Sequence, residues 1–191
     1  MDVKEFEKYP EVVKQVEDVV GGQGLNVLFN SAGISPRSSF LGMRALKVNE
    51  LMDVYSVNCV APLMLSKAFS PLLKKAAKIN NKDPMGVSRA VIINMSSILG
   101  SIELNNVGSL YHYRVTKSGL NAVTKSMSID LKMDGIMAIA LSPGHVKTDM
   151  GGDKAPLEVE ESCKHMADII FNLKPSNNGT FIEYNGKTLP W

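Results

Sequence analysis

Cysteine is scarce in this chain of 191 residues. Its two cysteines, Cys59 and Cys163, lie far apart and form no C-x-x-C arrangement. The chain therefore lacks a disulfide framework, which indicates a reduced, intracellular protein, and we expect it in the cytoplasm. Both cysteines lie in apolar, helix-like stretches, so we expect them to be small buried hydrophobes.

Net charge, long apolar runs and metal-binding spacings are also lacking. The formal net charge of +2 is too small to indicate binding to nucleic acid or to an acidic membrane surface. No apolar run is long enough to span a membrane, and the polar first residues do not form a secretory signal. Histidines occur without H-x-H or H-E-x-x-H spacing, so no metal site is expected, and we expect His112 and His145 at the surface.

What the chain does have is an alternation of short apolar runs and amphipathic stretches. Its 45% hydrophobic and 21% charged residues suit one globular domain over residues 1–191. We predict buried strands at 25–29, 90–95 and 136–141 and a last strand at 180–184. We predict helices at 11–20, 49–79, 111–133 and 158–172, with Pro62 and Pro71 expected to kink or divide the second. This order predicts an α/β fold, a doubly wound parallel sheet of about four strands with helices on both faces.

Ligands of such sheets bind outside the carboxyl ends of the strands, which directs attention to three loops. The first contains Asn30-Ser31-Ala32-Gly33, the second contains Ser96-Ser97, and the third contains Pro143-Gly144 with Val146 and Thr148 beyond it. Taken singly, such a loop is better explained as an ordinary turn. Taken together, one after each of three predicted strands, they indicate a binding site.

Tyr113 and Lys117 lie four residues apart, so they share one face of the predicted helix 111–133. A phenol with a pKa of about 10 is a poor acid–base group near neutrality. A nearby ammonium favours the phenolate, and we expect Lys117 to lower the pKa of Tyr113 enough to make it a general acid. Ser97, on the loop above, is placed to hold a substrate carbonyl oxygen.

This combination resembles the short-chain dehydrogenase/reductase family over essentially the whole chain. The family's N-N-A-G motif appears as Asn30-Ser31-Ala32-Gly33, and its V-N-x-x-[AG] motif appears as Val57-Asn58-Cys59-Val60-Ala61. Its Y-x-x-x-K motif matches Tyr113 to Lys117, and its P-G motif matches Pro143-Gly144. Within the family, the sequences M-S-S-I-L-G-S at 95–101 and V-K-T-D-M at 146–150 look closest to the C-factor and sniffer-like carbonyl reductases.

The resemblance implies a Rossmann-like fold and an NAD(P)H-dependent oxidoreductase that transfers hydride between nicotinamide and a carbonyl or alcohol substrate. It implies NADP(H) as cofactor, with NAD(H) left open. The catalytic residues that it implies are Asn58, Ser97, Tyr113 and Lys117. Tyr113 and Lys117 also belong to the cofactor-binding residues that it implies, together with Asp2, Val3, Asn30, Ala32, Gly33, Pro143, Gly144, Val146 and Thr148. It further implies a homodimer through the helices 49–79 and 111–133.

One departure from the family is large. The family begins with a strand and a T-G-x-x-x-G-x-G loop that holds the cofactor diphosphate, and this sequence contains no such motif. Met1 aligns near the end of the family's third strand, so we expect an N-terminally truncated domain with weak dinucleotide binding and with residues 25–29 as a bare sheet edge. The alternative function is therefore a catalytically inactive product that binds no dinucleotide and acts only through subunit association.

Overall fold

The predicted apolar runs form a sheet with β1 at one edge. The computed structural model describes residues 1–191, with the side chains of residues 37–40 excepted. Its strands are β1 (Val27–Asn30), β2 (Val91–Met95), β3 (Met137–Ser142), β4 (Phe181–Glu183) and β5 (Thr188–Leu189), in the order β1-β2-β3-β4-β5. The first four strands pair in parallel, as predicted, which confirms the α/β, Rossmann-like class. The strand at 180–184 is not the last, because β5 follows the turn at Asn185-Gly186 and pairs antiparallel with β4.

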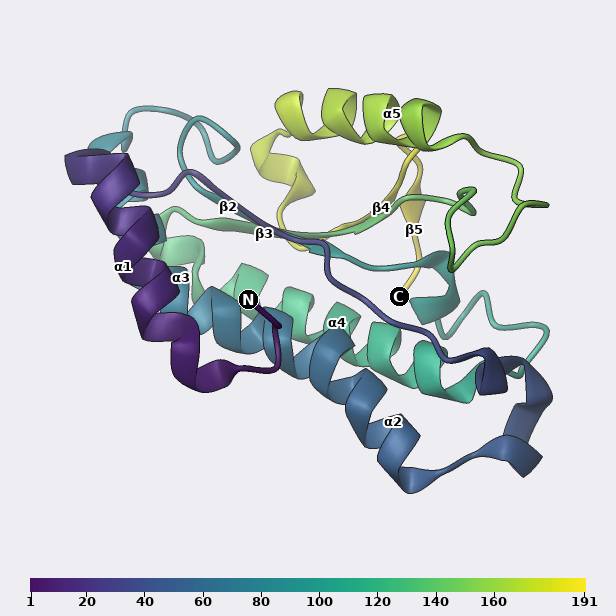
Figure 1. The fold of residues 1–191 in the computed structure, drawn as a ribbon. Helices are drawn as coiled ribbons and strands as arrows, with labels where there is room; N and C mark the ends of the chain where they lie inside the picture. Colours follow the sequence, from purple (N-terminus) through teal and green to yellow (C-terminus); the bar gives the residue numbers. More distant parts are fainter.

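Helices cover both faces of the sheet. They are α1 (Tyr9–Val20), α2 (Val48–Tyr55), α3 (Ala61–Ile79), α4 (Tyr111–Asp130) and α5 (Val159–Phe171). Figure 1 shows α5 on one face of the sheet and α3 and α4 on the other, with α1 beyond the β1 edge. Short 3-10 turns lie at Phe6–Lys8, Gly21–Gln23, Arg37–Ala45, Ile98–Gly100, Lys132–Asp134 and Pro175–Asn177. No helix in the part of the chain described is long and apolar enough to cross a membrane.

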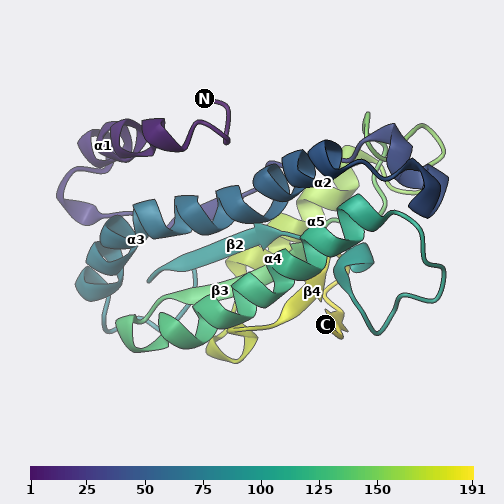
Figure 2. The same cartoon turned by 90° about the horizontal axis from the view of Figure 1, so that it is seen from below.

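The predicted helix over 49–79 is continuous, but part of it is π-helical and not α-helical. A π-helical segment, Ser56–Val60, joins α2 to α3, and Figure 2 shows the resulting long rod lying beside α4. Pro62 lies directly after the π-helical segment, so its missing N–H falls where the hydrogen bonding of the rod is already irregular. Pro71 lies inside α3 without ending it. The two prolines therefore do not divide the helix, and the irregularity lies in the π-helical segment instead.

The core has two layers because neighbouring residues of a strand point to opposite faces. Ile92 and Ala138 pack on α3 and α4, in a cluster that includes Phe69, Leu73 and Met127. Val91, Ile93, Met137 and Ile139 pack on α5. The strands β2 and β3 are therefore buried on both faces, which explains why their sequences are continuously apolar.

The sheet ends abruptly at β1. Val27 is 36% exposed and Phe29 is 41% exposed, although both belong to an apolar strand. The helix α1 is anchored at its start by the buried Tyr9, but further along it packs through partly buried side chains such as Val12 and Val16, while Val19 is 86% exposed. The exposure of Val27 and Phe29 agrees with the expectation of a bare edge at 25–29.

Candidate active site

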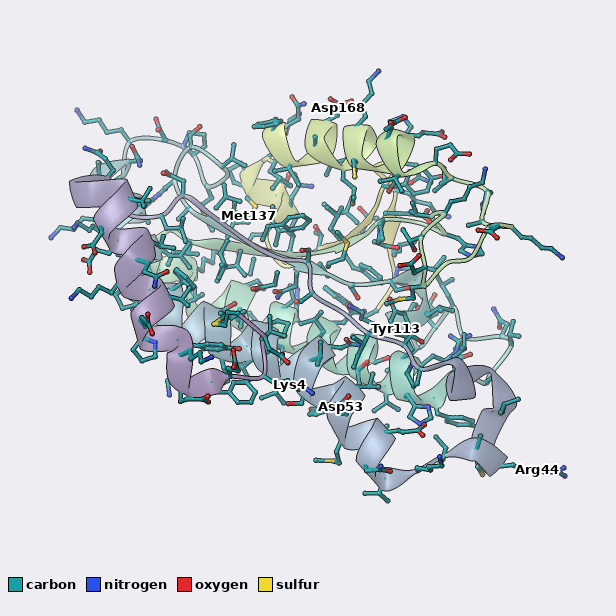
Figure 3. The ribbon with its side chains drawn as sticks, viewed as in Figure 1. Lys4, Arg44, Asp53, Tyr113, Met137 and Asp168 are labelled. Atoms are coloured by element: carbon teal, nitrogen blue, oxygen red, sulfur yellow. The ribbon has the colours of Figure 1, made fainter. Side chains whose placement is uncertain are left out.

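The three predicted loops leave the same edge of the sheet. The parallel register places Asn30 beside Asn94 on β2, and Met95 beside Leu141 on β3. The segments after β1, β2 and β3 therefore emerge side by side, where ligands of parallel sheets bind. In Figure 3 the labelled Tyr113 lies at this end of the sheet, at the start of α4.

Ser97 begins the short turn that follows β2 and faces Tyr113. Its hydroxyl accepts a hydrogen bond from the Leu99 amide at 3.2 Å and lies close enough to the Tyr113 phenol to act on its pKa. The turn packs tightly on α4 at Gly100, where an added Cβ would lie 2.9 Å from the Lys117 carbonyl carbon. The structure therefore brings Ser97 and Tyr113 together, as the sequence predicts.

Lys117 lies one helical turn beyond Tyr113 and is almost fully buried, with 2% of its surface exposed. Its Nζ donates to the Met95 carbonyl at 2.6 Å and lies 5.5 Å from the centre of the Tyr113 ring. Burial lowers the pKa of Lys117 to about 8, against a small opposing effect of Cys59. The amine thus lies between β2 and α4, beneath the phenol.

The prediction that Lys117 lowers the pKa of Tyr113 is wrong. Burial raises the pKa of Tyr113 above its usual value of 10, and only the nearby Ser97 hydroxyl opposes this effect. The physical reason is that removing the phenol from water disfavours the phenolate, while the ammonium of Lys117 is directed at the Met95 carbonyl. Tyr113 is therefore held as a neutral phenol, which is the form that donates a proton.

Asn58 lies at the centre of the π-helical segment and is fully buried. Its Oδ1 accepts from the Ile34 amide at 2.8 Å, and its Nδ2 donates to the Ile34 carbonyl at 2.9 Å and to Thr116 Oγ1 at 3.1 Å. A Cβ placed on Gly33 would lie 3.5 Å from both Asn58 Oδ1 and Lys117 Nζ. Asn58 therefore fixes the loop after β1 to α4, directly beside Lys117, and the widened turn is a common device at functional sites.

The amide of Asn30 points into the protein. Its Nδ2 donates to Asn94 Oδ1 at 2.8 Å and to Ser66 Oγ at 3.2 Å, and Asn94 continues the network to Thr124. The side chain of this predicted cofactor-binding residue thus joins β1 to β2 and α3. Ala32 and Gly33, beyond it, are the residues of this loop that face outward or toward Lys117.

A cavity of about 210 Å³ lies against the loop after β1. Its lining combines this loop with one face of the α2–α3 rod: Val3, Leu28, Phe29, Asn30, Ser31, Ala32, Val57, Ala61, Pro62 and Leu65. Of the two predicted cofactor-binding residues at the N-terminus, Val3 lines this cavity and Asp2 does not. The carboxylate of Asp2 instead accepts a hydrogen bond from the Lys4 amide. Lys4 also reaches Asp53 on α2 at 2.7 Å, and Figure 3 shows this pair. The sequence analysis missed the helical part, although Val57, Ala61 and Leu65 recur every four residues, the spacing of one helix face.

The Pro143-Gly144 turn is anchored on both sides. The Pro143 carbonyl accepts from Ser162 Oγ on α5 at 2.7 Å, and Gly144 has a φ of 79°. A Cβ on Gly144 would lie 2.6 Å from Leu157 and 2.7 Å from the Tyr184 ring, so the position requires glycine. Beyond it, Val146 forms a parallel bridge with Leu157, and Thr148 Oγ1 accepts from the Gly151 amide. The turn therefore presents its outer face at the same edge of the sheet as Ser97 and Tyr113.

Two other expectations are wrong. His112 is buried, with no exposed surface, because it faces the helix rod, where its Nε2 lies 4.0 Å from the Glu50 carboxylate. Cys163 is exposed on α5, and only Cys59 is buried, where it contacts Tyr55. His145 is exposed, as expected.

Comparison with known proteins finds relatives that are similar in sequence and in structure. The model of the short chain dehydrogenase family matches residues 1–158. The C-signal protein of Myxococcus xanthus is 32% identical over 167 residues, covering 87% of this chain and 93% of that protein. The solved structure of the carbonyl reductase Sniffer of D. melanogaster is 51% identical, with a TM-score of 0.97, covering 100% of this chain and 76% of that one. An NADPH-bound carbonyl reductase from chicken fatty liver is 36% identical, with a TM-score of 0.90, covering 100% of this chain and 75% of that one.

Proposed function

The chain belongs to the short-chain dehydrogenase family, and we propose that it is an NADPH-dependent carbonyl reductase. The observation that carries this proposal is the convergence of Ser97, Tyr113, Lys117 and Asn58 at the carboxyl edge of the sheet. The similarity to solved carbonyl reductases, one of them bound to NADPH, supports the substrate class and the cofactor.

The residues present fit the nicotinamide end of such a cofactor. The buried amine of Lys117 lies beside Gly33 and Asn58, within reach of a sugar hydroxyl placed over that loop. The separate cavity beside Val3 and Ala32, which none of Ser97, Tyr113 and Lys117 lines, is a mainly apolar space for another flat ring of the cofactor. For the diphosphate, the sequence offers no Gly-rich loop before a helix. Lys117, Ala32, Gly33 and the Pro143-Gly144 turn are therefore the residues that we propose hold the cofactor.

The protein's own groups divide the chemistry between them. A bound reduced nicotinamide supplies the hydride, and the chain supplies orientation and the proton. Tyr113, kept neutral by burial, donates its phenolic proton to the carbonyl oxygen of the substrate as that oxygen gains negative charge. Ser97 holds the same oxygen through its hydroxyl, and Lys117 stabilises the tyrosinate that the transfer leaves behind.

Replacement of the proton donor tests the proposal. We expect Tyr113→Phe to lower kcat for a carbonyl substrate by roughly a thousandfold while leaving NADPH affinity unchanged, because the ring is kept and only the donor is lost. Tyr111→Phe, two residues earlier on α4, is the matched control and should keep full activity. Equal turnover by the Tyr113→Phe variant and the parent would overturn the assignment.

A second candidate function is subunit association without catalysis. It is favoured by the exposed β1 edge. Titration of the purified chain with NADPH, followed by nicotinamide fluorescence, separates the two candidates. Binding at micromolar concentrations supports the reductase, and lack of saturation at millimolar concentrations supports association alone.

A further inference from the structure

The backbone just before the catalytic helix is strained. Gly108, Ser109 and Leu110 have φ angles of 70°, 57° and 54°, so three consecutive residues lie in the left-handed region. Only glycine adopts this region without cost, and each of the other two residues loses on the order of 1–2 kcal/mol. Such a turn persists only where neighbouring groups stabilise it.

Arg114 is one of the side chains that contact this turn. Its Nε donates to the Gly108 carbonyl at 3.1 Å and to the Ser109 carbonyl at 3.2 Å. Its Nη1 donates to the Leu99 carbonyl at 3.4 Å, in the turn that follows Ser97. A planar guanidinium with several fixed donors is suited to holding carbonyls from two segments at once, which a lysine ammonium does less well.

The segments before this turn are held by hydrogen bonds that do not involve Arg114. Ser118 Oγ and Asn121 Nδ2 donate from α4 to the Gly100 carbonyl at 2.9 and 3.2 Å. At the start of the loop, the Trp191 carbonyl accepts from the amides of Ile102 and Glu103 at 3.1 and 3.2 Å. The Ser97 turn and residues 101–103 therefore have anchors without Arg114. At residues 108–110 the guanidinium acts together with Asn105, whose Oδ1 accepts from the Gly108 amide at 3.0 Å.

We propose that Arg114 is a positioning residue for Tyr113, acting by stabilising the left-handed turn at 108–110. The Leu110 carbonyl at the end of this turn accepts from the amides of Tyr113 at 3.0 Å and Arg114 at 2.9 Å. The turn thus forms the beginning of α4 and sets where the phenol lies relative to Ser97. This inference rests on the proposed reductase function, in which Tyr113 is the proton donor.

Lys117 does not depend on the same turn. It lies one helical turn further along α4, is buried, and is held by the Met95 carbonyl. Its neighbour Thr116 is held by Asn58. Loss of Arg114 should therefore affect the proton donor and spare the residues that face the cofactor, which separates an effect on kcat from an effect on cofactor binding.

The experiment compares Arg114→Ala and Arg114→Lys with a control from the same helix. Lys125→Ala serves as this control, because Lys125 donates to a loop carbonyl outside the 101–110 segment, that of Gly179 at 3.3 Å. In Arg114→Ala we expect about tenfold faster amide hydrogen exchange at Asn105, Asn106, Gly108 and Tyr113, and a kcat lowered by about ten- to a hundredfold. The Kd for NADPH should stay within about twofold of the parent. The exchange rates and kcat of Arg114→Lys should lie between those of Arg114→Ala and the parent. Lys125→Ala should match the parent in all three measurements.

A second substitution separates positioning from general damage. Ser109→Asn in the Arg114→Ala background should slow the exchange and recover part of kcat, because asparagine occupies the left-handed region more readily than serine. Exchange at 105–113 that is unchanged in Arg114→Ala overturns the proposal, as does a loosened turn with unchanged kcat. If no form of the chain turns over substrate but exchange responds as described, the reductase assignment fails while the contact of Arg114 with the turn stands.

Discussion

At the scale of single residues, burial decides the properties of Tyr113 and Lys117. The two side chains share a helix face, and their charges alone would lower the pKa of the phenol. In the folded chain both groups are withdrawn from water, so each is driven toward its neutral form: the pKa of Tyr113 rises and that of Lys117 falls to about 8. Tyr113 is thus a neutral proton donor. When it gives up its proton, the negative charge of the tyrosinate stabilises the protonated form of Lys117.

The lowered pKa of Lys117 makes a prediction about stability. Because the folded pKa of about 8 lies below the ordinary value of 10.5, the unfolded chain binds more protons between these values. The contribution of Lys117 to the free energy of unfolding therefore rises with pH through that window. We expect Lys117→Met to be more stable than the parent at pH 7, and the difference to shrink by about 2–3 kcal/mol by pH 10.

Urea unfolding of both proteins at several pH values measures this difference. Comparing the two chains cancels the titration of the other groups, including tyrosines that ionise in the same range. A difference between variant and parent that stays constant from pH 7 to pH 10 would contradict the lowered pKa of Lys117. Lys125→Met, at a position on the same helix where the amine is not withdrawn from water to this extent, serves as the control.

At the scale of elements, β1 forms an exposed edge of the sheet. The strand alternates so that Asn26 and Leu28 bond toward β2, as shown by the bond from the Val91 amide to the Asn26 carbonyl. The backbone groups of Val27 and Phe29 then point away from the sheet. An apolar strand with unpaired backbone groups promotes pairing with another chain.

A charge on this edge should reduce such pairing. We expect Val27→Lys to lower light scattering during incubation at about 37 °C by several-fold, because lysine on an edge strand opposes strand addition. Val19→Lys is the control: it adds the same charge at an exposed valine of α1, away from any strand edge. Equal suppression by both variants would show that net charge, and not the β1 edge, controls aggregation.

Prediction from sequence succeeded where one local property determined the structure. The continuous apolar runs predicted the four parallel strands to within two residues. For β2 and β3 the reason is that strands buried on both faces need no polar positions. The two-residue strand β5 was missed because only its pairing with β4 defines it. The burial of His112, the exposure of Cys163 and the raised pKa of Tyr113 all depend on which neighbours the fold supplies, which spacing along one helix does not reveal.

At the scale of the whole molecule, the helix rod and α4 leave apolar side chains on the surface. Val48 and Met52 on α2, Leu63 on α3, and Val115 and Ile129 on α4 are between 40% and 78% exposed. Figure 2 shows these helices side by side on one face of the molecule. We propose that a second copy of the chain covers this face, in the homodimer that the family resemblance implies, because burying such side chains stabilises association.

A single charge tests the proposed dimer. Val115→Arg should raise the dimer dissociation constant by at least about tenfold in sedimentation velocity, because a guanidinium buried without a partner at an interface costs more than 1.4 kcal/mol. Val159→Arg is a matched control, since Val159 on α5 is 47% exposed where Val115 is 50% exposed, and α5 covers the opposite face of the sheet.

If Val159→Arg dissociates the dimer and Val115→Arg does not, the chains associate through the α5 face. A parent that sediments as a monomer at all concentrations would leave the apolar face of α2, α3 and α4 without the proposed partner. Because Val115 lies two residues from Tyr113, activity measured on both variants also tells whether association affects the position of the phenol.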